Sequence, residues 1–269
     1  MARILGILTN DPTLLRCQTA RLEPHVSFLP EEAFGLGSYE DDDVLLTKRP
    51  ANVGPRDLSI LTEGLHSPAL LAMGRREALY QEESVHPLRY RRWLFAMEGD
   101  GEALTKVREV MEAELPVFLG RSLRTVAARE RAFFLFLKFL HEQKQLEDPH
   151  LEASEAVRSL SRAVRAMDEA LGKFGETRPF PFVALATNGR ILVGARRGRP
   201  LAYHLGEGSG SCAACGFHER SDDPRIPAHR RARGVALATL PGPAGGFVEI
   251  PDQSVVAVER TLELNVASL

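Results

Sequence analysis

The order in which strand and helix patterns follow one another constrains the fold of this 269-residue chain more than any other feature. Short aliphatic stretches typical of strands occupy the first hundred residues and return after residue 180, and helical stretches fill the interval between them. The expected strands are 3–8, 34–39, 41–50, 68–74, 91–97, a hairpin over 180–197, 234–240, 246–251 and 254–259, and the expected helices are 101–115, 126–143 and 151–175. Because strands and helices do not alternate, the pattern favours an α+β fold with antiparallel sheets and segregated helices.

Local signals agree with antiparallel pairing and with one continuous unit. The dipeptide Asn188-Gly189 lies between two aliphatic runs, which is a strong hairpin signal. The Gly/Ser-rich stretch 206–216 is expected to be a loop and no domain boundary, because strands follow it that would complete the same sheet. With no repeat, low-complexity tract or obvious linker, we expect a single domain over 1–269.

Composition narrows the classes of function. The net charge of −2 and the pI near 6.5 argue against a nucleic-acid-binding protein, which usually carries a basic excess. No apolar run is long enough to span a membrane, and the start lacks the pattern of a signal peptide. The chain has three cysteines, an odd number that argues against a disulfide framework. A reducing, cytoplasmic location is therefore expected.

Several segments resemble, in order, those of class II glutamine amidotransferases, which are N-terminal nucleophile hydrolases. The start "MARILG" is similar to the family's "MCRLLG". Further similar segments are "EAFGLGSYEDDDVLLTKRP", "LLAMGRREA", "VHPLRYRRWLFAMEGDG", "RTVAARERAFFLFL" and "GVALATLPGPAGGFVEIPDQSVVAV". The resemblance covers nearly the whole chain and implies a four-layer αββα sandwich, an α+β fold, over 1–269.

The resemblance also implies that the glutaminase machinery has been lost. In the family, the residue after the initiator Met is a cysteine that supplies a thiol nucleophile and a free α-amine as base; here that residue is Ala2. The family's oxyanion hole uses an Asn-Gly pair, and the matching residues are Glu98 and Gly99. A carboxylate would repel a developing oxyanion, and loss of one donor from such a hole already costs about 10²–10³ in rate.

Two further positions concern the binding of substrate. Ala128 matches the aspartate that holds the amino group of glutamine in the family. Arg75 matches the arginine that pairs with the α-carboxylate, although it could equally be a surface residue beside Arg76. No catalytic position is therefore expected to be intact, and Arg75 alone is a candidate ligand of a vestigial glutamine or another carboxylate.

These substitutions favour a glutamine amidotransferase-like pseudoenzyme that acts as a binding or regulatory protein with a protein partner, and with neither nucleic acid nor membrane. The alternative is an active glutamine amidotransferase whose nucleophilic cysteine was replaced by Ala2. The two differ at Glu98 and Ala128, where an active parent would carry Asn and Asp.

A second candidate site lies in the Gly/Ser-rich loop. Cys212 and Cys215 have C-x2-C spacing, His218 follows three residues later, and His229 lies further along. Thiolate and imidazole ligands suit tetrahedral Zn²⁺, and no other cofactor is expected. The alternatives are a pair of free thiols or a labile disulfide. A zinc site here would favour a third function, a metal-stabilised interaction scaffold. Cys17 is expected to be a small apolar residue of the first helix.

Overall fold

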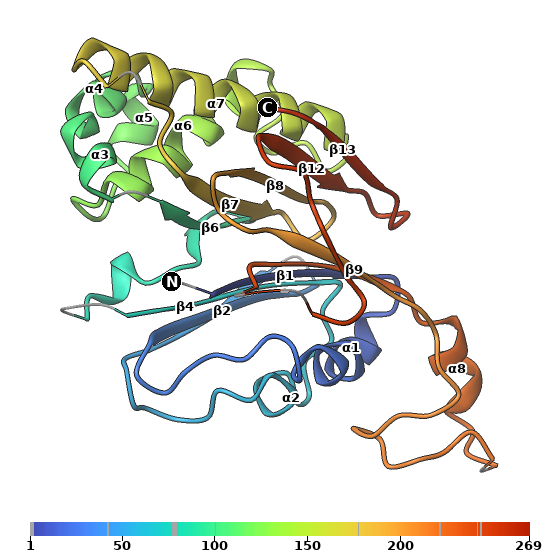
Figure 1. Ribbon diagram of the computed structural model, residues 1–269. Coiled ribbons are helices and arrows are strands. Elements are labelled where there is room, and N and C mark those ends of the chain that lie inside the picture. The colour runs from blue at the N-terminus through green and yellow to red at the C-terminus, as the bar shows by residue number, and fades with distance from the viewer. Residues whose placement is uncertain are drawn as a thin grey trace.

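Two antiparallel sheets stack face to face, and helices cover the outer face of each (Figure 1). The computed structural model describes residues 3–41, 43–76, 80–99, 101–176, 178–220, 222–240, 242 and 244–269. Helices α3 to α7 lie on one side, and α1 and α2 lie on the other (Figure 1). The predicted four-layer αββα sandwich is confirmed.

The larger sheet has seven strands within the described residues, in the order β11-β9-β10-β1-β4-β2-β3. Its strands are β1 (Arg3–Thr9), β2 (Ala33–Glu40), β3 (Asp43–Arg49), β4 (Ala69–Arg75), β9 (Ala202–Gly206), β10 (Gly234–Ala238) and β11 (Phe247–Glu249). β1 lies at its centre and pairs antiparallel with β10 and with β4.

The smaller sheet, over the same described residues, has six strands in the order β13-β12-β8-β7-β6-β5. Its strands are β5 (Leu88–Tyr90), β6 (Trp93–Gly99), β7 (Phe182–Thr187), β8 (Leu192–Arg197), β12 (Ser254–Val258) and β13 (Leu264–Ser268). The hairpin predicted around Asn188 joins β7 to β8, and the Asn188 side chain accepts hydrogen bonds from the amides of Arg190 and Ile191.

The helices form two outer layers, and one further helix lies in a projecting connection. They are α1 (Leu15–Leu22), α2 (Leu58–Leu61), α3 (Gly101–Lys106), α4 (Arg108–Ala113), α5 (Val117–Gly120), α6 (Ala128–Glu142), α7 (Ala153–Lys173) and α8 (Ile226–Arg231), with single 3-10 turns at Pro12–Leu14 and Glu82–Ser84. α8 belongs to the connection between β9 and β10, which projects away from the sandwich (Figure 1). No helix among the described residues has the length and apolarity needed to cross a membrane.

β1 alternates its side chains between two separate cores. Ile4 and Leu8 are buried between the two sheets, whereas Leu5 and Ile7 are buried between the larger sheet and its helices. This is the period of two expected of a strand covered on both faces. Gly6 faces the gap between the sheets, where an added Cβ would lie 2.9 Å from Leu192. The glycine therefore lets the sheets approach closely.

Aromatic contacts join α6 to the smaller sheet in the core beneath the helices. α6 is buried along nearly all of its length, as its apolar sequence predicts. Phe133 of α6 stacks on Phe95 of β6 at 5.0 Å between ring centroids. Phe136 packs edge-on against Trp93 at the same centroid distance. These contacts hold α6 directly over β6, the strand that carries Glu98.

Several sequence predictions need correction. The helix predicted over 101–115 is two short helices, because Val107 leaves helical geometry with φ −105° and ψ 8°. β5, β9, β13 and α8 were not predicted. β5 has three residues, β9 and β13 are largely exposed or only partly buried, and α8 spans six residues rich in arginine. β5 and β9 lack the extended apolar alternation by which strands are recognised. The alternation Leu-Glu-Leu-Asn-Val over 262–266, which leads into β13, is a strand signal that the prediction missed.

We expect Leu5→Ala to destabilise the protein by about 2–5 kcal/mol, because it leaves a cavity beneath the central strand. Urea unfolding of the full chain measures the loss. Leu205→Ala is the matched control, because Leu205 lies on β9 of the same sheet but is 54% exposed. A similar loss of stability in both variants would contradict the central position of β1.

Candidate functional site

A cleft of about 420 Å³ opens where strands of both sheets end. Adjacent antiparallel strands begin and end at the same edge, so the start of β1 lies beside the ends of β4 and β10, and the end of β6 lies beside the start of β7. The cleft is lined by Arg3, Leu29, Glu32, Arg75, Arg76, Glu98, Val183, Arg199, Pro200, Thr239 and Leu240. Two positions that the family resemblance singles out, Arg75 and Glu98, are among these lining residues.

Two ion pairs line the cleft. Glu98 of β6 pairs with Arg199, with 2.9 Å between Oε1 and Nη1. Glu32 pairs with Arg3 at the same distance. Both carboxylates are well buried, with side chains only 13% and 2% exposed. Their charges are therefore held by specific arginines and not by water.

Arg75 faces the cleft and is half-buried at the end of β4. Arg76, the next residue, is exposed and pairs with Glu31 outside the cleft lining, at 2.8 Å. The two arginines thus differ in environment although they are adjacent in sequence. The role of Arg75 as a ligand of a carboxylate stays a prediction.

The other matched positions lie in different surroundings. Gly99 is buried at the end of β6 opposite Phe182, and an added Cβ would lie 3.2 Å from the Cβ of Phe182. Ala128 is the first residue of α6 and packs into the core beneath the helices. It is not among the described residues that line the cleft. Ala2 lies outside the described residues.

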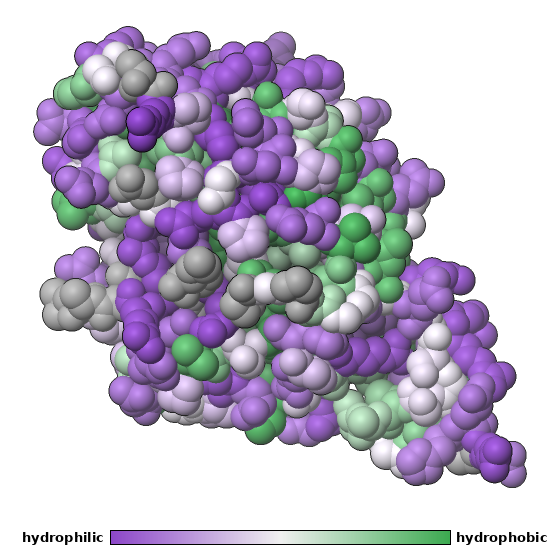
Figure 2. Space-filling model, in the orientation of Figure 1, coloured by the Kyte–Doolittle hydropathy of each residue, from purple (hydrophilic) through white to green (hydrophobic). Residues whose placement is uncertain are grey.

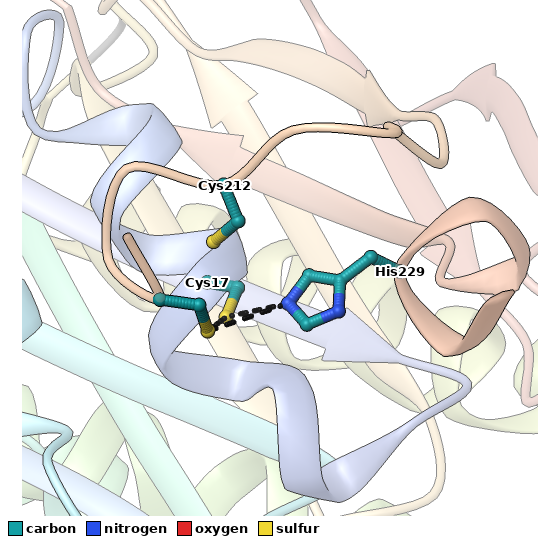
Figure 3. A group of neighbouring side chains, drawn as sticks. Cys17, Cys212 and His229 are labelled. Carbon is teal, nitrogen blue, oxygen red and sulfur yellow. Dashed lines mark hydrogen bonds between the residues drawn. The ribbon is translucent and has the colours of Figure 1, made fainter. Parts of the chain in front are cut away.

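A cluster of three cysteines and one histidine lies at the opposite edge of the larger sheet (Figure 3). Cys17 comes from α1, Cys212 and Cys215 from the connection between β9 and β10, and His229 from α8. Their ligand atoms all lie within 4.8 Å of one another. The Sγ of Cys17 is 3.4 Å from that of Cys215 and 3.3 Å from Nε2 of His229. This cluster could hold a metal ion such as zinc.

Of the four predicted ligands, the cluster contains Cys212, Cys215 and His229. Cys17 takes the place of the fourth, His218. His218 is exposed and is not part of the cluster. The residue before it, Phe217, forms an antiparallel bridge with Cys212, which fixes where the chain leaves the turn. Cys17, expected to be a plain apolar residue, takes the fourth position. The odd number of cysteines was the only hint in the sequence, because Cys17 lies almost two hundred residues from the others.

The turn that carries two of the cysteines is closed by backbone hydrogen bonds. The amides of Gly216 and Phe217 both donate to the carbonyl of Cys212, and the amide of Cys212 donates to the carbonyl of Phe217. Gly216 has φ +74°, a left-handed conformation that glycine adopts without steric cost. The reversal of the chain at Gly216 brings Cys215 beside Cys212.

Burial alters the thiols of the cluster. It raises the pKa of the Cys17 thiol far above its ordinary value, and the neighbouring thiols of Cys215 and Cys212 raise it further. Burial likewise raises the pKa of Cys215. These shifts favour the protonated thiols of Cys17 and Cys215, and a bound metal ion would reverse that preference.

Comparison with known structures supports the architecture. No protein-family model and no curated protein sequence matches the chain. Among solved structures, a glutamine aminotransferase class-II domain protein from Silicibacter pomeroyi is 16% identical with a TM-score of 0.63, over 99% of this chain and 98% of the other. A predicted glutamine amidotransferase from Pseudomonas aeruginosa PA01 is 16% identical with a TM-score of 0.56, over 99% and 100%.

A third similar structure is the glutamine phosphoribosylpyrophosphate amidotransferase of B. subtilis, 13% identical with a TM-score of 0.50. The match covers 99% of this chain but only 49% of that one. At these identities the likeness shows a shared fold. The chain therefore has the fold of class II glutamine amidotransferase domains, the αββα sandwich of N-terminal nucleophile hydrolases.

Proposed function

We propose that this protein is a class II glutamine amidotransferase-like pseudoenzyme that does not hydrolyse glutamine and that binds a small carboxylate in the retained cleft. The ion pair between Glu98 and Arg199 carries the proposal. It places a charged carboxylate, held by its own arginine, on the strand from which the family builds its oxyanion hole.

The Glu98 side chain is unsuited to stabilising an oxyanion. An oxyanion hole needs hydrogen-bond donors directed at the developing negative charge. An ionised carboxylate only accepts hydrogen bonds, and it repels a second anion. Arg199 neutralises Glu98 through an ion pair of 2.9 Å, so each charge is balanced by the other. An asparagine at this position would have no charge for Arg199 to pair with.

The sequence at two other positions agrees with this proposal. Ala2 supplies no thiol, and Ala128 supplies no carboxylate for the amino group of a substrate. Replacing a catalytic cysteine alone would leave Asn and Asp at the positions of Glu98 and Ala128. The observed residues therefore favour a pseudoenzyme over an active amidotransferase that has lost only its nucleophile.

The charge of the cleft favours an anionic ligand. Four arginines and two glutamates line it, so positive charge exceeds negative charge. Guanidinium groups bind carboxylates through paired, charge-assisted hydrogen bonds. The volume of about 420 Å³ lies within the usual range for sites that bind small molecules. Arg75, half-buried at the strand end, is the arginine we assign to the ligand's carboxylate.

A pseudoenzyme performs its function by binding a ligand or a protein partner and not by catalysis. We propose that the carboxylate in the cleft regulates association with a protein partner. The cleft opens at the surface between the two sheets, so a ligand there would be exposed to a protein docked over the strand ends.

We expect the wild-type protein to release no ammonia from L-glutamine above the buffer blank. Ala2→Cys alone should not restore activity, because the oxyanion site and the amino-group site remain altered. The measurement is glutamate and ammonia release, with mass spectrometry to verify that Met1 is removed from the variant. The triple variant Ala2→Cys, Glu98→Asn, Ala128→Asp is the matched comparison. Substantial turnover by the single variant would contradict the pseudoenzyme proposal.

We expect calorimetry to detect binding of at least one ligand from a panel of small mono- and dicarboxylates that includes L-glutamate. Arg75→Gln should weaken that binding about 10- to 100-fold, because a hydrogen bond to a charged group contributes about 1.5–3 kcal/mol. Arg158→Gln is the control for loss of charge, because Arg158 is exposed on α7 and pairs with Glu155. Equal affinity in wild type and Arg75→Gln, or no binding across the panel, would argue against the assigned ligand.

A further inference from the structure

The spacing of the cysteine and histidine atoms fits one tetrahedral metal ion. Zn²⁺ binds thiolate sulfur at about 2.3 Å and imidazole nitrogen at about 2.0–2.1 Å, so its ligand atoms lie about 3.5–3.8 Å apart. The Sγ atoms of Cys17 and Cys215 are 3.4 Å apart, and Nε2 of His229 lies 3.3 Å and 3.5 Å from them. The Sγ of Cys212 lies within 4.8 Å of these three atoms. Small side-chain movements would therefore bring all four ligand atoms to bonding distance from a central ion.

The imidazole of His229 is prepared for this role. Its Nδ1 lies 2.9 Å from the carbonyl oxygen of Arg225, which can only accept a hydrogen bond. The proton of the neutral ring therefore belongs on Nδ1, and the lone pair of Nε2 points at the cysteines (Figure 3). A backbone carbonyl in this position is the usual outer partner of a metal-bound histidine. The ring is also held edge-on by Phe217, at 4.7 Å between centroids.

Arg225, which pairs with Asp223, lies beside the cluster. Three thiolates and one Zn²⁺ would leave one excess negative charge there. The Arg225 guanidinium donates a hydrogen bond to the carbonyl of Cys215 at 3.1 Å and lies over the Phe217 ring. Asp223 holds it there through an ion pair of 2.7 Å. A cation is thus fixed beside the cluster by contacts that do not involve the sulfur atoms.

The segment 207–233 has little apolar material of its own. Its contact with α1 is a small satellite core whose buried members are Leu14, Cys17, Cys212, Phe217, Ile226 and Ala232. Two of these six residues are ligands of the cluster. The projecting end of the segment is mostly hydrophilic on the face seen in Figure 2. Apolar burial therefore gives only modest support to a connection that leaves the sandwich.

We propose that Cys17, Cys212, Cys215 and His229 bind one Zn²⁺ that fastens the connection between β9 and β10 to α1. Three sulfur ligands favour zinc over magnesium, calcium or manganese, which prefer oxygen. Four protein ligands leave no open position, which is the arrangement of a structural and not a catalytic zinc. The site does not depend on the function proposed for the cleft.

The first experiment measures metal in the purified full-length protein. Elemental analysis should give about one zinc per chain. X-ray absorption at the zinc edge should show three sulfur atoms at about 2.3 Å and one nitrogen at about 2.0–2.1 Å. Protein grown with added zinc that contains no metal, or that contains a disulfide between any two of these cysteines, would overturn the proposal. Two sulfur ligands in place of three would contradict the three-cysteine site.

The second experiment uses two histidine variants. His229→Ala should lose the zinc, and His218→Ala should keep it, because His218 is exposed and outside the cluster. Cys17→Ser should lose zinc as His229→Ala does. Equal zinc retention in both histidine variants would overturn the assignment, and so would loss from His218→Ala alone.

The third experiment tests the structural role on wild-type protein, so that no variant needs to fold. Removal of zinc with a chelator should make 207–233 sensitive to limited proteolysis while the sandwich stays resistant. Re-addition of zinc should restore protection. Unchanged proteolysis after complete metal removal would contradict the fastening role. Carboxylate binding in the cleft is measured on the same samples and is expected to be unchanged, so the two proposals can fail separately.

Discussion

The rest of the structure depends on the burial of β1 between two cores. Its alternate side chains enter the core between the sheets and the core beneath α1 and α2, and both of its edges are paired. A seven-residue strand fixed in this way has little freedom to shift in register, because a slip of one residue would exchange its two faces. Arg3 at its start is therefore held in the cleft, and the helix after its end carries Cys17 toward the metal cluster.

The charge arrangement in the cleft shows how two carboxylates can be accommodated at the strand ends. A single buried carboxylate on β6 would be costly, because an unpaired charge in a protein interior is poorly solvated. Glu98 is accompanied by Arg199, and Glu32 by Arg3, so each carboxylate has its own cation within 2.9 Å. Arginine therefore supplies four of the residues that line the cleft, and two of them pair with these carboxylates.

Sequence patterns identified the elements that are buried on both sides, and also the partly exposed β3 and β11, but they missed several other elements whose burial is partial. β1, the hairpin of β7 and β8, and the apolar α6 follow from their residues alone, because local periodicity and turn chemistry decide them. β9, β13 and α8 owe their structure to neighbouring segments. The metal cluster shows the same limit, since the turn with Cys212 and Cys215 is a local signal but the approach of Cys17 is set by the packing of α1. His218 is the histidine nearest to Cys215 in sequence, but α8 places His229 beside the cysteines.

The cleft and the cluster of three cysteines and one histidine lie at opposite ends of β1 and β10. β10 begins directly after the segment 207–233 and ends at Ala238. The next residue, Thr239, lines the cleft, and its hydroxyl accepts a hydrogen bond from the amide of Ile4. All five residues of β10 are buried, and the strand is paired with β9 on one side and with β1 on the other. Burial and pairing on both sides oppose a shift of this strand, and coupling through a packed element needs two discrete arrangements of it. The metal should therefore order the connection that it binds and leave the geometry of the cleft to the sandwich itself.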